Sequence, residues 1–334
     1  MLAAVTVDRC RVELREVPEP EPAADEALLR IGAVGLCGTD LHMWAGERSG
    51  VGFPLRQGHE IGAVVERLPA DGSGAHLSVG DVVAVDPSFP CGSCPACVRG
   101  DWPFCARFTA IGVARPGGLA EALAVPADHL HPVLGVSADA AALVEPVSVA
   151  AMALRRSEVG AGERLVVLGA GPIGLGLVLC AVDVGIGVLV ADPLPSRLEV
   201  AAALGADAVV APEALGDAVR DWTGGDGAQA VVEASGSAQA VRDAVGLVGR
   251  GGRLVVVGLG DAEVRIPVSR LLFDGVQVTG SRAGLFPEAA RVVGAHPEAA
   301  LRLVSHRFGL AEVAEAFAQA HDRPAETVKV LVGP

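Results

Sequence analysis

The chain has 334 residues, of which 51% are hydrophobic and only 3% aromatic. This length exceeds what a single small core supports, so we expect two globular domains. The 26 basic and 40 acidic residues give a formal net charge of −14, which disfavours a nucleic acid as a partner.

Nothing near the beginning of the chain indicates export, because the first segment becomes polar within ten residues. The most apolar stretch, residues 165–191, is interrupted by glycines and by Asp183, so it predicts two buried strands with a helix between them rather than a membrane span. We therefore expect a cytoplasmic protein with no membrane partner. In that compartment seven cysteines indicate metal ligation rather than disulfides.

The pattern of hydrophobic residues changes near Arg164. Before this point, short alternating runs such as residues 27–35, 62–68 and 80–87 predict a β-rich domain. After it, apolar strands alternate with amphipathic helical stretches such as residues 237–251, which predicts a parallel sheet with helices on both faces. A helix over 310–322 and a strand over 327–332 are expected in the tail. The predicted fold class is therefore α/β.

A glycine-rich turn follows the first strand of this second part. Gly169, Gly171 and Gly174 match the GxGxxG pattern, with Pro172 and Ile173 between the last two glycines. Glycines there allow a tight turn and let a pyrophosphate approach the N-terminus of the following helix. The alternative is a packing turn without a ligand.

Asp192 ends the next predicted strand, about 20 residues further on, where a carboxylate can accept hydrogen bonds from ribose hydroxyls. This residue favours NAD over NADP. Arg197, five residues later, either faces a 2′-phosphate or lies on a solvated helix.

Four cysteines lie within fifteen residues: Cys91, Cys94, Cys97 and Cys105. Four thiolates on one loop can close a tetrahedral zinc site and leave no position for substrate. We interpret this loop as a structural zinc site. A redox pair of cysteines is the alternative, but four evenly spaced thiols fit tetrahedral closure better.

A second candidate metal group is dispersed and consists of Cys37, His59, Glu60 and Glu145. Sulfur, nitrogen and oxygen ligands together are typical of a catalytic zinc. Each residue has an ordinary alternative as a core cysteine, a buried histidine or a charge at a helix N-terminus. The linear sequence does not show that these residues meet.

The motifs CGTDLH (37–42), GHEIGAVVE (58–66), the four-cysteine loop, EPVSVA (145–150) and GAGPIG (169–174) occur in one order. In this order the chain resembles the zinc-dependent medium-chain dehydrogenases, the relatives of alcohol, sorbitol and threonine dehydrogenases. The resemblance implies three segments with the active site in a cleft between the domains: a GroES-like catalytic domain (1–147) with its zinc loop (91–105), a Rossmann NAD-binding domain (148–280) and a C-terminal return to the catalytic domain (281–334).

The resemblance also implies one catalytic and one structural zinc per chain. Cys37 and His59, with Glu60 or Glu145, would hold the catalytic zinc, and the choice between the two glutamates stays open. Glu145 stands where liver-type alcohol dehydrogenases have a second cysteine, which places the chain nearer the polyol and threonine branch.

Further roles follow from the same resemblance. Thr39 and His42 match a hydroxyl and imidazole proton relay, for which an exposed loop histidine is the alternative at His42. Ser281 and Arg282 lie where relatives contact cofactor or substrate.

We therefore expect an enzyme that transfers hydride from a secondary alcohol of a polyol, amino alcohol, cyclitol or similar small molecule to NAD, giving the ketone. A simple alcohol, aldehyde or aldose dehydrogenase of the same family is an alternative. A non-catalytic regulatory protein that binds zinc and nucleotide is another. A homodimer or homotetramer is expected.

Overall fold

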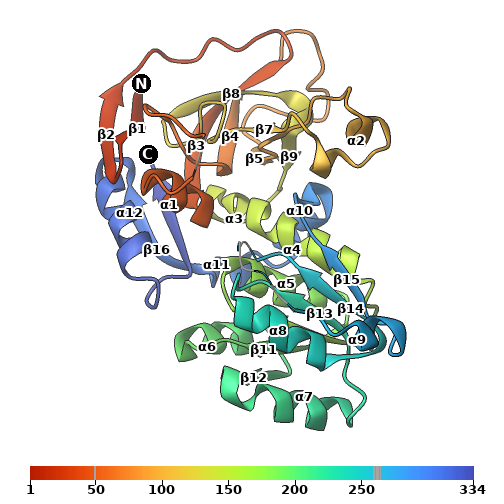
Figure 1. The fold of residues 1–334 in the computed structure, drawn as a ribbon. Coiled ribbons are helices and arrows are strands. Elements are labelled where there is room, and N and C mark those ends of the chain that lie inside the picture. Colours follow the sequence, from red (N-terminus) through yellow and green to blue (C-terminus); the bar gives the residue numbers. More distant parts are fainter. Residues whose placement is uncertain (49, 259, 261–262, 264) are drawn as a thin grey trace. The chain divides into compact units, whose positions relative to one another are not determined.

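The structure is a computed structural model that describes residues 1–48, 50–258, 260, 263 and 265–334. It divides into two compact units, Met1–Glu145 with Val293–Pro334 and Pro146–Val292 (Figure 1). The second boundary lies after the expected one at residue 280. Residues beyond 280 stay with the second unit because the Leu285 N–H donates to the Ser148 carbonyl over 2.9 Å and Arg291 pairs with Asp183.

The first unit contains most of the strands. Its elements are β1 (Leu2–Asp8), β2 (Arg11–Glu16), β3 (Glu26–Leu36), α1 (Gly38–Trp44), β4 (Glu60–Arg67), β5 (Val82–Val85), β6 (Ser88–Phe89), α2 (Pro95–Val98), η1 (Trp102–Phe104), β7 (Thr109–Ala110), β8 (Ala122–Pro126), η2 (Ala127–His129), β9 (Leu130–Pro132), α3 (Ala138–Ala142), α11 (Pro297–Leu301), β16 (Val304–Gly309), η4 (Leu310–Glu312), α12 (Val313–Asp322) and β17 (Lys329–Gly333).

The long strand β3 organises the first unit. The main sheet has the order β16-β17-β3-β4-β5-β9, and β8 also pairs with β3. β3 is antiparallel to β4, β8 and β17, with Gly35 opposite Glu60 on one side and Leu331 on the other. The last strand of the chain therefore lies beside the residues that precede Cys37.

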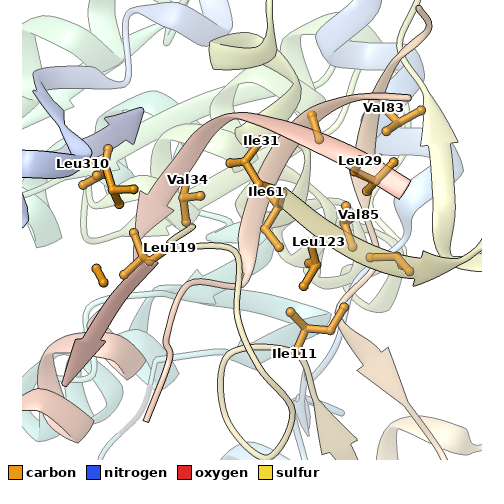
Figure 2. Close-up of a cluster of buried hydrophobic side chains, with 14 of the residues drawn as sticks. Leu29, Ile31, Val34, Ile61, Val83, Val85, Ile111, Leu119, Leu123 and Leu310 are labelled. Carbon is orange, nitrogen blue, oxygen red and sulfur yellow. The ribbon is translucent and has the colours of Figure 1, made fainter. Parts of the chain in front are cut away.

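The core of this unit is a cluster of aliphatic side chains, part of which Figure 2 shows. Alternate residues of β3, such as Leu29 and Ile31, meet Ile61 of β4 and Val83 of β5. Burying each such side chain contributes about 1.5–3 kcal/mol. The alternation seen in the sequence thus gives a packed face that fixes the strand ends carrying the candidate ligands.

The second unit alternates strands and helices. Its elements are α4 (Val144–Ser157), β10 (Arg164–Leu168), α5 (Pro172–Asp183), β11 (Gly187–Ala191), α6 (Pro195–Ala203), β12 (Ala208–Val210), η3 (Pro212–Ala214), α7 (Leu215–Thr223), β13 (Ala228–Glu233), α8 (Ala238–Leu247), β14 (Val248–Val256), α9 (Val268–Leu272), β15 (Gln277–Gly280) and α10 (Phe286–Ala295).

These strands form one parallel sheet of order β12-β11-β10-β13-β14-β15, as the sequence predicted. The order reverses between β10 and β13, where a doubly wound sheet binds its ligand at the carboxyl ends of the strands. Leu168 of β10 pairs with Ala191 and Glu233, so the loops after these strands begin at the same edge. The helix expected over 237–251 ends at Leu247, and β14 follows directly.

Residues 165–191 fold as β10, α5 and β11, which confirms the interpretation of this apolar stretch. In the described part of the chain, no helix has both the length and the hydropathy needed to cross a bilayer.

Candidate functional site

The structure brings three of the dispersed candidate ligands together. One ligand atom each of Cys37, His59 and Glu60 lies within 4.8 Å of the other two. Cys37 is the residue between β3 and α1, and Glu60 begins β4 directly after His59. They meet because the pairing of β3 with β4 sets Gly35 opposite Glu60. A thiol, an imidazole and a carboxylate are a ligand set that zinc accepts.

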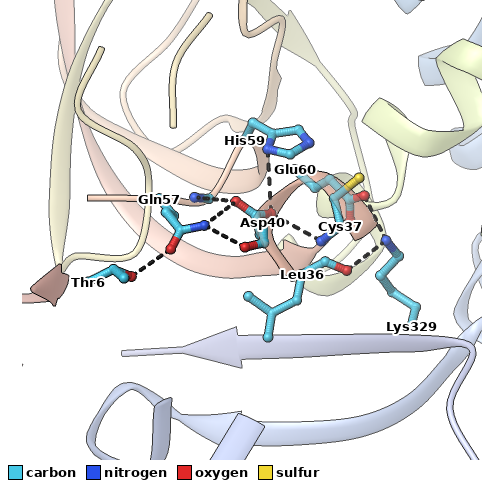
Figure 3. A network of polar contacts seen from close by, with 9 residues as sticks. Thr6, Leu36, Cys37, Asp40, Gln57, His59, Glu60 and Lys329 are labelled. Atoms are coloured by element: carbon cyan, nitrogen blue, oxygen red, sulfur yellow. Dashed lines mark hydrogen bonds and ion pairs between the residues drawn. The ribbon is translucent and has the colours of Figure 1, made fainter. Parts of the chain in front are cut away.

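Asp40 fastens the two segments that carry these residues. Its buried carboxylate accepts hydrogen bonds from the Cys37 N–H (3.0 Å) and the Gly58 N–H (3.2 Å). Its Oδ2 also lies 3.5 Å from Nδ1 of His59 (Figure 3). A carboxylate at one imidazole nitrogen orients the ring and leaves the other nitrogen for a metal. Asp40 therefore supports both Cys37 and His59.

A second layer of polar side chains supports Asp40 in turn. Gln57 Nε2 donates to the Asp40 carbonyl over 2.8 Å, and the Thr6 hydroxyl donates to the Gln57 side-chain oxygen. All three residues are at most 1% exposed. Neither Asp40 nor Gln57 was among the residues predicted from the sequence. The signal for Asp40 was its place three residues after Cys37, where an acidic side chain can cap a helix.

Glu60 shows directly that the site suits a cation. Its Oε1 pairs with Lys329 Nζ at 2.6 Å, whereas its buried Oε2 has no hydrogen-bond partner among the described residues. A Cβ atom on Gly35 would overlap Oε2, so glycine there makes room for the carboxylate. Leaving a buried carboxylate oxygen without a partner is costly, and a metal ion would satisfy it.

The charges around His59 agree with this conclusion. Burial alone would lower the pKa of His59, but the Asp40 carboxylate and the Cys37 sulfur reverse that effect and raise the pKa well above its usual value. The site attracts positive charge. The residues present therefore fit a zinc ion.

Glu145 lies outside this close group. Among the described residues, only Cys37, His59 and Glu60 form the dispersed group whose ligand atoms lie within 4.8 Å. Burial raises the pKa of Glu145 to about 7, with Glu60 adding to the rise and His59 opposing it. The charges of the site thus shift the pKa of Glu145, but Glu60 and not Glu145 belongs to the close group.

The two predicted relay residues lie on α1. Thr39 is half-buried two residues after Cys37. His42 is exposed, and its Nδ1 lies 2.6 Å from a carboxylate oxygen of Glu47. The structure therefore places His42 at the surface with an acidic partner, and the relay itself stays a prediction.

The four-cysteine loop forms a second compact group. Its four sulfur atoms lie within 4.8 Å of one another and belong to Cys91, Cys94, Cys97 and Cys105. All seven cysteines of the chain are free. The Arg107 guanidinium donates to the Cys91 sulfur over 3.4 Å, and the Cys91 N–H donates to the Cys105 sulfur over 3.3 Å. Hydrogen bonding from the Ser93 backbone, supported by Arg107, lowers the pKa of Cys91 to about 5. The thiolate form of Cys91 is thus favoured, whereas burial, with the neighbouring cysteines, raises the pKa of Cys97 to about 12, so this thiol would lose its proton when a metal binds.

Replacing Cys94 with serine is expected to remove one zinc per chain and to lower the melting temperature by about 5 °C or more, because metal binding stabilises the loop. Metal analysis and thermal denaturation measure both effects. The exposed Cys10→Ser is the matched control and should behave like the parent. Unchanged zinc content and melting temperature in Cys94→Ser would show that the loop holds no structural zinc.

Two glycines of the GxGxxG turn are required by close packing. Gly169 has φ +98°, and a Cβ there would lie 2.9 Å from the backbone of Ser235. A Cβ on Gly174 would overlap the carbonyl oxygen of Gly169. Any side chain at either position would therefore push the turn out of shape.

Gly171 has a different role, because a Cβ there would meet no atom of the described residues within 4 Å. It precedes α5, which begins with Pro172 and Ile173, and all three residues are half-buried. The N-terminus of α5 is thus open to an anion such as a pyrophosphate.

Asp192 joins this turn to the end of β11. Its Oδ2 accepts from the Ala170 N–H at 2.7 Å and its Oδ1 from the Leu194 N–H at 2.9 Å. Each carboxylate oxygen has a further lone pair that can accept from a ribose hydroxyl. Arg197 is half-buried in the first turn of α6.

Ser281 and Arg282 follow β15 at the carboxyl edge of the sheet. The Ser281 N–H donates to the Val256 carbonyl over 2.9 Å, and Arg282 is exposed. Their predicted contacts with a ligand stay predictions.

Glu233 was not identified from the sequence, although it ends the strand beside β10. It is fully buried, and its Oε1 accepts from the N–H groups of Ser235 (2.7 Å) and Gly236 (2.9 Å). Since Ser235 packs on Gly169, Glu233 stabilises the loop on which the glycine turn rests.

Two family models and several known proteins match this chain. The family model described as an alcohol dehydrogenase GroES-like domain matches residues 23–135, and the model described as a zinc-binding dehydrogenase matches residues 172–296. The L-galactonate-5-dehydrogenase of Escherichia coli K12 is 36% identical over 91% of this chain and 89% of its own length. The D-altritol 5-dehydrogenase of Agrobacterium fabrum is 33% identical over 99% and 98%.

A solved structure shows the same architecture. A Sinorhizobium meliloti 1021 protein described as a zinc-binding dehydrogenase, in a crystal structure with NADP bound, superposes with a TM-score of 0.90 at 30% identity, and the match covers 100% of this chain and 99% of that one. The domain models, the close curated relatives and this structure agree with the GroES-like and Rossmann architecture expected from the motifs. The chain therefore belongs to the zinc-dependent medium-chain dehydrogenases and is an enzyme of that family.

Proposed function

We propose that this enzyme oxidises a secondary alcohol of an open-chain polyol or sugar acid to the ketone, with NAD as the hydride acceptor. The carbinol carbon gives its hydride to the nicotinamide, and the hydroxyl proton leaves to solvent. The observation that carries this proposal is the buried group of Cys37, His59 and Glu60 with an unsatisfied carboxylate oxygen.

When bound, zinc is a Lewis acid that makes an alcohol a stronger acid. The chain's own residues supply the rest of the site. Cys37, His59 and Glu60 would hold the metal, and Asp40 orients His59. The turn at Gly171 and the carboxylate of Asp192 would hold the dinucleotide by its pyrophosphate and ribose.

The substrate class is supported by the relatives. L-galactonate-5-dehydrogenase and D-altritol 5-dehydrogenase are named for oxidation at carbon 5 of six-carbon open-chain compounds, one an acid and one a polyol. We therefore place the reacting hydroxyl on such a chain rather than on a simple alcohol.

A panel of hexitols, hexonates, amino alcohols, cyclitols and primary alcohols tests this proposal. The zinc-loaded protein is assayed with NAD at the absorbance of the reduced cofactor. We expect the highest kcat/KM with a hexitol or a hexonate. Faster turnover of a primary alcohol, or no turnover of any compound, would overturn the proposal.

We propose Thr39 as the first group of the proton relay, with His42 passing the proton to solvent. Thr39→Ala is expected to keep zinc and NAD affinity but to lose roughly tenfold or more in kcat, because a positioned proton acceptor contributes about 10²–10⁴. His42→Ala should lose less, with partial recovery at higher pH. Steady-state kinetics and NAD titration measure these effects. Parental turnover in Thr39→Ala would show that the relay is wrong.

We further propose that the enzyme lies in the cytoplasm, because free thiols persist there. We also propose that it forms a homo-oligomer. The open edge at β15 supports self-association, because Val278 and the neighbouring Val268, Leu272 and Phe273 are exposed. The Phe273→Asp variant is expected to be more monomeric than the parent protein when the two are compared by light scattering. A parent that is monomeric at every concentration would contradict this proposal.

A further inference from the structure

Lys329 is the only lysine in the chain, and the other 25 of the 26 basic residues are arginines. Lysines in proteins are mostly exposed. This one is 2% exposed and begins β17, close to the end of the chain. A single lysine in a buried position needs a specific reason, because everywhere else this sequence uses arginine.

The contacts of Lys329 lie at the candidate metal group. Its Nζ is 2.6 Å from Glu60 Oε1 and donates to the Leu36 carbonyl over 3.1 Å (Figure 3). Leu36 directly precedes Cys37. One ammonium group therefore fastens both segments that carry predicted ligands, at the point where β17 and β4 flank β3.

The ion pair leaves one oxygen of Glu60 unused. In the described part of the structure, Oε2 makes no hydrogen bond although it is buried, and a Cβ atom at position 35 would overlap it where it now lies. A pair that served stability alone would be expected to satisfy both oxygens, because a half-satisfied buried carboxylate is unfavourable. An oxygen held in place without a hydrogen bond is what a metal ligand requires.

The choice of lysine over arginine follows from the same geometry. An ammonium is a compact charge that can bond one carboxylate oxygen and one carbonyl oxygen at once. A guanidinium is planar and tends to engage both oxygens of a carboxylate in parallel. Arginine at this position would therefore compete for Oε2.

We propose that Lys329 is a positioning residue of the metal centre, which holds Glu60 by one oxygen so that the other stays available to zinc. This inference rests on the metal assignment in the proposed function. Its charge also balances the anionic group formed by Cys37, Asp40 and Glu60. Lys329 acts through Glu60 and does not contact the reacting atoms.

Zinc retention in three variants tests this role. Lys329→Met removes the charge at similar length, and Lys329→Arg keeps the charge but has a planar, longer head group. Arg323→Met, at the exposed C-terminal cap of α12, is the control that removes a charge from the surface. Each protein is titrated against a chelator, and zinc per chain is measured.

The four-cysteine zinc serves as an internal standard for folding. We expect Lys329→Met to bind the catalytic zinc at least tenfold more weakly, in the range typical for partners of metal ligands, while the other zinc stays. Lys329→Arg should recover only part of the loss, and Arg323→Met should match the parent. If the parent holds two zinc ions and Lys329→Met holds both equally tightly, the role of Lys329 is refuted. A parent without the second zinc would instead refute the metal assignment, and this proposal with it.

A second measurement uses the parent enzyme. It tests the role of Lys329 even if the Lys329→Met variant loses both zinc ions by unfolding. Protein labelled with ¹³C at the lysine ε-carbon gives a single side-chain signal, because the chain has one lysine. Removal of the labile zinc by chelator should move this signal, and added zinc should restore it. A signal that stays unchanged while zinc leaves and returns would overturn the proposal.

Discussion

Cys37→Ser is expected to lose catalytic turnover by roughly a thousandfold or more while the protein stays folded. Cys37 is half-buried at the start of α1, and serine fits its space. The hydroxyl of serine is a far weaker zinc ligand than a thiolate, so only His59 and Glu60 remain to hold the metal. The backbone bond from residue 37 to Asp40 does not depend on the side chain and should persist.

Metal analysis, thermal denaturation and kcat/KM on the same preparation check this expectation. Zinc should fall from about two per chain to about one, since the four-cysteine loop is untouched. The control is Cys10→Ser, which removes an exposed thiol outside both groups. Cys37→Ser with full zinc and parental turnover would remove Cys37 from the metal centre.

Replacement of Asp192 is expected to change the cofactor preference. In the parent, the carboxylate would accept hydrogen bonds from the adenosine ribose, and it would repel a 2′-phosphate. A hydrogen bond to a charged group contributes about 1.5–3 kcal/mol, so Asp192→Ser should lose roughly 10- to 100-fold in kcat/KM with NAD. Its kcat/KM with NADP should rise relative to NAD.

The structure adds a control that the sequence did not suggest. Because Asp192 also accepts from the N–H groups of Ala170 and Leu194, a small residue loosens the glycine turn as well as removing the charge. Asp192→Asn keeps one acceptor oxygen and should gain NADP use with a smaller loss of NAD affinity. Initial rates with both cofactors give the ratio. Equal kcat/KM of the parent with NAD and NADP would show that Asp192 does not discriminate.

Motifs that are local in the sequence predicted most of the architecture. The parallel sheet followed from strand and helix periodicity, and the GxGxxG turn from its place between β10 and α5. The four cysteines also converge, because a loop of fifteen residues can bring its own side chains together. In each case the residues lie near one another in the sequence, so a short stretch of chain is enough to bring them together.

Features that depend on distant strands could not be predicted in this way. Lys329 reaches Glu60 only because β17 and β4 both pair with β3, and no spacing in the sequence shows that pairing. Asp40 reaches His59 because β4 pairs with β3, which brings the residue before β4 next to the helix after β3. The exposure of His42 beside Glu47 likewise depends on its place on α1, and the motif alone left an exposed histidine open as the alternative.

Zinc held by Cys37, His59 and Glu60 is expected to be required for alcohol oxidation. The most direct test removes the labile zinc with a chelator and then follows turnover while zinc is added back in fractions of an equivalent. We expect the protein with about one zinc per chain to be folded but inactive, and we expect activity to return linearly and to be complete near the second equivalent. Full activity in the protein that holds only the four-cysteine zinc would contradict it.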